Sequence, residues 1–179
     1  MLELNIEKKD LWDETNNEFL LLDAFTLKLE HSLLSLTKWE SKWKKPFLSD
    51  APKTYEETID YIRCMTISQN IPDYYYNAIG SEELTKIKEY ISDPMTATTI
   101  KETPGKGSNE IWTSELIYYT MIEFGIPMEC EKWHLNRLLT LIRVCSIKNS
   151  PSKKMTKSEI LIKNSELNAK RRAQLNSRG

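Results

Sequence analysis

Apolar residues occupy every second position over residues 2–6 and again over residues 25–29. A period of two is typical of short strands that bury one face, so we predict two such strands that pair with each other. Between them, residues 9–22 contain the turn-prone pair Asn16 and Asn17 and predict a short helix or an ordered loop.

From Ser32 onward the apolar spacing becomes helical. Ser32 and Thr54 are typical N-cap residues for two helices, and Pro46 ends the first of them. Further segments follow: a tyrosine-rich segment at 72–80, helices at 81–93 and 113–125, and the longest apolar stripe at 130–147. The stretch 96–112 holds a glycine-containing turn around Gly105 between residues that favour strands, so it predicts a β-hairpin.

These elements predict a mainly α fold. Residues 1–150 are expected to form one mostly helical globular domain with a short N-terminal β-element and one small β-hairpin. Residues 151–179 are expected to form a basic tail that is partly helical or flexible. A length of 179 residues with 40% hydrophobic and 28% charged positions agrees with one globular domain and a small appendage.

Charge is divided unevenly along the chain. From Lys153 onward there are eight bases and two acids, a net charge of +6, whereas the rest of the chain carries −7. A basic segment can attract nucleic acid or an acidic partner, and self-association also fits an acidic body with a basic tail. A solvated tail is the plainer interpretation, and the absence of zinc-finger, RNP or helix-turn-helix spacing argues against nucleic acid.

The first residues and the length of the apolar runs argue against a membrane segment and against secretion. No apolar run is long enough for a membrane helix, and the first residues lack the basic and apolar regions of a secretory signal. We therefore expect a cytoplasmic protein. The odd number of cysteines, three at wide spacing, does not suggest a disulfide framework.

The sequence contains no recognisable catalytic or metal-binding motif. Gly105 to Ser108 lack the spacing of a phosphate-binding loop, and a nucleophile elbow does not occur. Cys130 and His134 would share one helical face, but two local ligands are too few for zinc. His31 is expected to have a structural, hydrogen-bonded role. We predict no catalytic residue, no cofactor and no metal, and hence not an enzyme.

Aromatic residues with charged neighbours are the better candidates for function, because tryptophan and tyrosine dominate protein-protein hot spots. Trp39 and Trp43 are four residues apart and share a helical face flanked by lysines, and the spacing leaves open whether this face is core or interface. The predicted partner-binding residues are Trp39, Trp43, Tyr74, Tyr75, Tyr76, Lys170, Arg171 and Arg172.

Five segments of the chain together resemble a known protein family. They are residues 29–43 (LEHSLLSLTKWESKW), 61–66 (YIRCMT), 131–139 (EKWHLNRLL), 147–151 (IKNSP) and 167–176 (LNAKRRAQLN). As a set they are similar to a small protein encoded among the tail genes of long-tailed bacteriophages, in the family of tail assembly chaperones. The resemblance covers nearly the whole chain.

The resemblance implies a non-enzymatic role in the cytoplasm of the host cell. A member of this family would bind the tape measure protein, keep its apolar helices soluble, recruit tail tube subunits, and be absent from the finished virion. Two alternatives stay open. One is a structural virion component, such as a tail or head-tail completion protein, and the other is a nucleic-acid-binding phage protein acting through the basic tail.

Overall fold

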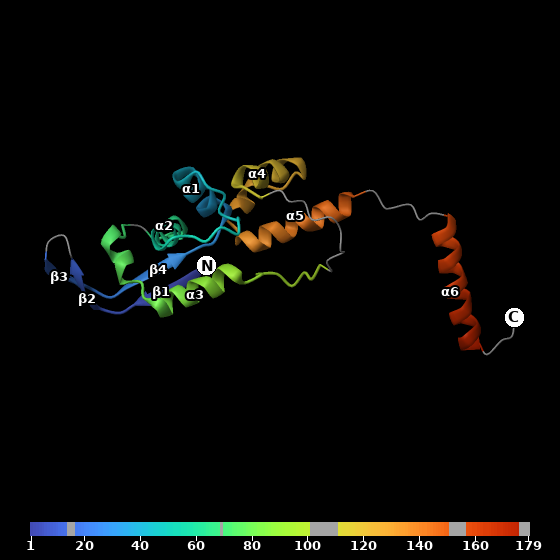
Figure 1. Cartoon of the computed structure of the whole chain (residues 1–179), viewed down its shortest axis with the longest axis horizontal. Helices are drawn as coiled ribbons and strands as arrows, with labels where there is room; N and C mark the ends of the chain where they lie inside the picture. The colour runs from blue at the N-terminus through green and yellow to red at the C-terminus, as the bar shows by residue number, and fades with distance from the viewer. Residues whose placement is uncertain (14–16, 69, 101–110, 151–156, 176–179) are drawn as a thin grey trace. The chain divides into compact units, whose positions relative to one another are not determined.

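A computed structural model describes residues 1–13, 17–68, 70–100, 111–150 and 157–175 (Figure 1). The chain divides into two compact units, Met1–Ser146 and Ile147–Gly179. The described part is mainly α-helical with short β-elements, as the sequence predicts. None of its helices is long and apolar enough to cross a membrane.

The first unit contains the predicted pair of strands. Strand β1 (Leu2–Ile6) runs antiparallel to β4 (Phe25–Leu29), with Leu4 opposite Leu27. Alternate side chains of both strands are buried, which confirms the interpretation of the period of two.

The segment between these strands differs from the prediction of a short helix or loop. Strand β2 (Lys9–Asp13) instead pairs antiparallel with β3 (Glu18–Leu22), and we call this pair of strands the β2–β3 hairpin. Asn17 at its turn adopts φ = 51°, the left-handed conformation that asparagine tolerates better than most residues. The backbone hydrogen bonds of β2 and β3 are therefore made between two strands and not within a helix.

The two predicted N-caps begin helices. Ser32 caps α1 (Leu33–Trp43) and Thr54 caps α2 (Tyr55–Met65), each through a reciprocal capping box. Lys44 ends α1 in the left-handed conformation, and its backbone N–H donates to the Glu40 carbonyl. Both helices therefore begin where the sequence indicates.

The next elements are the 3₁₀ helix η1 (Asp73–Ala78) and the helix α3 (Ser81–Ser92). The predicted hairpin around Gly105 falls mostly on residues 101–110, which lie outside the described residues. Its described flanks, 96–100 and 111–113, are not strands.

The single helix predicted from Cys130 to Ile147 is divided into two elements in the structure. After α4 (Ser114–Glu123) the chain forms the 3₁₀ helix η2 (Met128–Lys132), and α5 begins only at Leu135 and runs to Asn149. Trp133 is extended between them, and the backbone N–H of Leu135 donates to the His31 carbonyl at 2.7 Å. This tertiary bond fixes the break, so Cys130 and His134 do not share a helical face.

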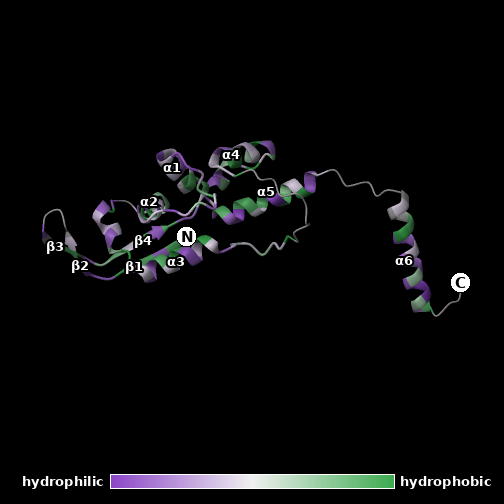
Figure 2. Cartoon of the chain, viewed as in Figure 1, coloured by the Kyte–Doolittle hydropathy of each residue, from purple (hydrophilic) through white to green (hydrophobic). Residues whose placement is uncertain are grey.

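Two apolar clusters hold the first unit together. One gathers the buried faces of β1, β4, α2 and α3 around Trp39, and the other packs α4 and α5 against Leu33 and Leu36 of α1. Helix α1 therefore contributes to both clusters. Figure 2 shows the apolar residues of α3 and α5. Buried Glu40 joins further segments, since its carboxylate accepts 2.8 Å bonds from the N–H groups of Phe47 and Ser114.

The second unit contains α6 (Lys157–Leu175). The described side chains of this helix are exposed, among them Leu161, Ile162, Leu167 and Leu175. Its apolar residues do not gather into one strong stripe.

Candidate functional site

The β2–β3 hairpin turns an apolar face outward. Trp12 pairs across the strands with Phe19, and Leu21 lies two residues further along β3 on the same face. The exposed fractions are 50% for Trp12, 70% for Phe19 and 61% for Leu21. The Trp12 and Phe19 rings meet edge to face with 4.9 Å between their centroids. We call these three residues the hairpin face.

The opposite face of the hairpin attaches it to the body. Leu22 is fully buried in the first apolar cluster and Leu11 is packed against that cluster. The Lys9 ammonium donates to the Ala78 carbonyl at 2.9 Å, which ties β2 to the end of η1. The hairpin face is therefore presented on an anchored element, although two strands alone would be marginal in water.

The charge around the hairpin face is negative. Residues 7–23 contain six acids and two bases. Of the two bases, Lys9 is used in the bond to Ala78 and Lys8 lies 3.7 Å from the Asp23 carboxylate. An exposed aromatic surface in an acidic setting favours a partner that is apolar and carries basic residues.

The predicted tryptophans lie between α1 and α2 instead of on a free face. Trp39 is 1% exposed, and its Nε1–H donates to the Glu57 carbonyl at 2.9 Å. Trp43 is half-buried, and its Nε1–H donates to the Asp60 carboxylate at 2.8 Å. The Trp39 ring is thus a core residue of this fold and offers a partner almost no surface.

The three predicted tyrosines have three different environments. Tyr76 is buried and donates to the Thr66 hydroxyl at 2.9 Å, and Tyr75 packs edge to face on Phe25. Tyr74 is exposed and lies against Tyr75, with 4.9 Å between ring centroids. Because η1 contacts β2, Tyr74 belongs to an element that adjoins the hairpin.

The predicted basic residues lie near the end of α6. Lys170, Arg171 and Arg172 are exposed there. They belong to the second unit, whereas the predicted tryptophans and tyrosines belong to the first.

A second apolar surface lies on α4. Tyr119 and Ile122 are exposed on this helix, and Ile111 and Trp112 precede it with exposed side chains. The helix is apolar on most of its circumference, while only Ser114, Ile117 and Met121 are buried. We call Tyr119 and Ile122 the α4 face.

The two histidines form part of a buried polar cluster. His31 Nδ1 and the Tyr61 hydroxyl share a 2.6 Å hydrogen bond, and His134 Nε2 lies 3.0 Å from the Tyr90 carbonyl. Burial, and secondly the nearby His134, lowers the pKa of His31 from 6.5 to about 3. Burial also lowers the pKa of His134, against the Tyr90 carbonyl, which raises it. Both rings are therefore neutral near pH 7.

Charged groups also surround this cluster. The Tyr90 hydroxyl donates to Glu30 at 2.6 Å, and the other oxygen of that carboxylate lies 2.9 Å from the Met1 ammonium. Burial and the Glu30 carboxylate raise the pKa of Tyr90. These contacts are structural, and among the described residues no group of three or more His, Cys, Asp or Glu side chains could hold a metal ion.

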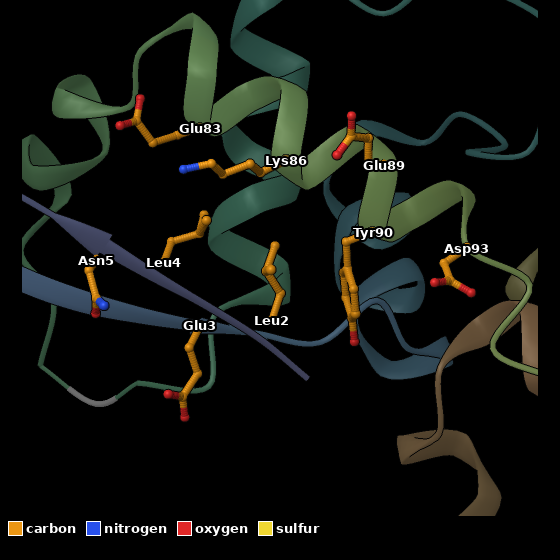
Figure 3. Close-up of a pocket in the computed structure, with 9 residues that line it drawn as sticks. All are labelled: Leu2, Glu3, Leu4, Asn5, Glu83, Lys86, Glu89, Tyr90 and Asp93. Carbon is orange, nitrogen blue, oxygen red and sulfur yellow. The ribbon is translucent and has the colours of Figure 1, made fainter.

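A polar hollow of about 450 Å³ lies between β1 and α3 (Figure 3). Leu2 and Leu4 point from β1 toward the helix, which carries Glu83, Lys86, Glu89 and Tyr90, and Asp93 follows its last residue. Three of its four carboxylates already have contacts within the chain: Glu3 with Lys28 at 3.1 Å, Glu83 with the N–H of Gly80 at 2.8 Å, and Asp93 with the N–H of Met95 at 2.7 Å. The hollow therefore carries no functional assignment.

The hairpin face was not among the residues predicted from the sequence. A signal was present, since the apolar run 19–22 follows the turn-prone Asn16 and Asn17, which is typical of a hairpin. The run has no polar alternation, so the sequence does not tell which of its side chains face solvent.

Comparison with known proteins adds nothing to this geometry. No family model, no curated protein and no solved structure matches the chain.

Proposed function

We propose that this protein is a non-enzymatic binding protein that covers an apolar segment of a partner, and that it acts as a bacteriophage tail assembly chaperone. The observation that carries the proposal is the hairpin face, where Trp12, Phe19 and Leu21 are exposed together on an anchored hairpin. Exposed aromatic residues of this kind are the usual anchors of protein interfaces.

The resemblance to phage tail proteins supplies the partner. The resemblance implies that the partner is a tape measure protein with long apolar helices to be kept soluble. Such a helix with basic flanks would suit the hairpin face and its acidic setting. Recruitment of tail tube subunits in the host cytoplasm would follow from the same role. The proposal needs no cofactor and no catalytic residue.

The test is recovery of the tagged protein from phage-infected cells, with mass spectrometry of the bound proteins and of purified virions. The expected result is recovery of the tape measure or tail tube protein, with this chain missing from the particles. Its presence in particles would instead make it a structural component. Recovery of nucleic acid alone would contradict both roles.

A pair of matched variants assigns the surface. Trp12→Ala with Phe19→Ala is expected to lower partner recovery strongly, because truncating the aromatic anchors of an interface costs about 2 kcal/mol or more of binding free energy. Tyr119→Ala with Ile122→Ala removes comparable apolar area from the α4 face and is expected to leave recovery unchanged. The opposite pattern would move the binding surface from the hairpin to α4.

A further inference from the structure

A small, mostly apolar hollow of about 300 Å³ lies where α1 ends and α2 begins. Trp39, Pro46 and Pro52 are among the residues that line it, and the Trp39 side chain is 1% exposed. Lys45, Lys53 and Glu57 are the charged residues that line it. Its volume is at the small end of the range for ligand pockets, and a few polar groups among apolar ones are typical of such sites.

The Lys53 ammonium has aromatic neighbours. Its Nζ lies 4.4 Å from the centroid of the Phe47 ring and 6.0 Å from that of a Trp39 ring. Within the described chain, no carboxylate forms an ion pair with Lys53. Burial lowers the pKa of Lys53, while the charge of Glu57 raises it in part.

The Glu57 carboxylate is already committed to other groups. It accepts a 2.6 Å bond from Lys45 Nζ and a 2.8 Å bond from the backbone N–H of Thr54. These bonds lower the pKa of Glu57, the one from Lys45 most of all. Glu57 and Lys45 therefore satisfy each other, and Lys53 is the cation left for an incoming anion.

We propose that this hollow binds a small carboxylate that carries a flat apolar group. The carboxylate pairs with the Lys53 ammonium, and the apolar group lies against Pro46 and Pro52. A partly desolvated ammonium gains more from an anion than a fully hydrated one does, so the charge of the ligand decides its affinity. The assignment does not depend on the hairpin face and stands apart from the proposed chaperone role.

The test uses N-acetylphenylalanine and its uncharged match, N-acetylphenylalaninamide. Each is titrated into the full chain labelled with nitrogen-15. The resonance of the Trp39 indole N–H reports binding, since that group donates to the backbone carbonyl of Glu57, and both residues line the hollow. The acid is expected to bind saturably and the amide at least about tenfold more weakly, the usual effect of losing a charged hydrogen-bonded pair.

Three variants identify the cation. Lys53→Gln is expected to weaken the acid at least about tenfold, whereas Lys53→Arg, which keeps the charge, retains most of the affinity. Lys88→Gln removes an exposed lysine from α3 and is expected to change nothing. Equal affinity for acid and amide, no saturable binding of the acid, or an unchanged affinity in folded Lys53→Gln would each overturn the proposal. The comparison of acid with amide uses the unaltered protein, so it decides the matter even where a variant fails to fold.

Discussion

The two small sheets of the first unit are built alike and expose different surfaces. Each is an antiparallel pair of five-residue strands. The outward face of β1–β4 is polar, with Glu3 paired to Lys28 at 3.1 Å and Thr26 bonded to Asn5 at 2.8 Å. The outward face of β2–β3 carries aromatic and aliphatic side chains instead.

The difference lies in the exposed faces of the two sheets, since both bury their other face in the first unit. A sheet with one face in the core ordinarily turns polar side chains to solvent, as β1–β4 does. The hairpin buries Leu22 and still exposes Trp12, Phe19 and Leu21, so its outer face is not explained by the stability of this chain. The two sheets therefore differ in the side chains on their outward faces and not in the pairing of their strands.

The largest expected effect comes from matched truncations in the two sheets. Leu27→Ala in β4 removes a fully buried side chain and is expected to lower the free energy of unfolding by about 2–5 kcal/mol. Leu21→Ala in β3 removes an exposed one and is expected to change it by less than about 0.5 kcal/mol. Chemical denaturation measures both. A loss from Leu21→Ala as large as that from Leu27→Ala would show that the hairpin face is a structural surface.

The second effect concerns binding and stability in the same variant. Trp12→Ala with Phe19→Ala is expected to cost at most about 1.5 kcal/mol of stability, the scale of one aromatic pair. Its affinity for the partner is expected to fall by a factor of about 30 or more, which corresponds to about 2 kcal/mol. Calorimetric titration with the partner, beside thermal unfolding of the variant, separates the two quantities. A cooperative fold with unchanged affinity would exclude the hairpin face as the binding surface.

The third effect is a dependence of stability on pH at the end of β4. His31 follows that strand, and its pKa of about 3 in the folded chain lies below the ordinary 6.5. The unfolded chain therefore binds more protons, so stability is present above pH 6.5 and is lost as the pH falls toward 3, by up to about 1.4 kcal/mol per pH unit. The lowered pKa of His134 acts in the same direction.

Hydrogen exchange between pH 7 and 5 measures this loss and extends the comparison of the sheets. Amides of β1–β4 are expected to lose protection as the pH falls, in proportion to the loss of global stability. The His31→Gln variant is expected to show a shallower dependence, since one titrating group is gone while a side chain able to bond to Tyr61 stays. A slope equal to that of the unaltered chain would assign the effect to other groups.

The sequence predicted what is determined locally. Ser32 and Thr54 begin their helices because an N-cap is a contact between residues three apart, which a sequence displays directly. The period of two over residues 2–6 and 25–29 revealed β1 and β4 in the same way. Fold class followed from such local signals.

The features that the sequence did not predict depend on distant neighbours. The spacing of Trp39 and Trp43 shows that they share a face, but only the packing of α2 shows that Trp39 is covered. The apolar spacing continues through η2, whereas the break before α5 comes from the bond to the His31 carbonyl. The hairpin face was missed for the same reason, since the side on which Phe19 and Leu21 lie is decided by where Leu22 is buried.

The smallest expected effect is that of removing residues 153–179. They belong to a compact unit of their own, and the described side chains of α6 are exposed. The free energy of unfolding of the first unit is therefore expected to change by less than about 0.5 kcal/mol. The hydrogen-exchange rates of the amides in both sheets are expected to stay unchanged. Circular dichroism is expected to lose only the signal of α6. A larger loss of stability would show that this segment supports the first unit. A loss of partner binding alone would show that Lys170, Arg171 and Arg172 contribute to binding in addition to the hairpin face.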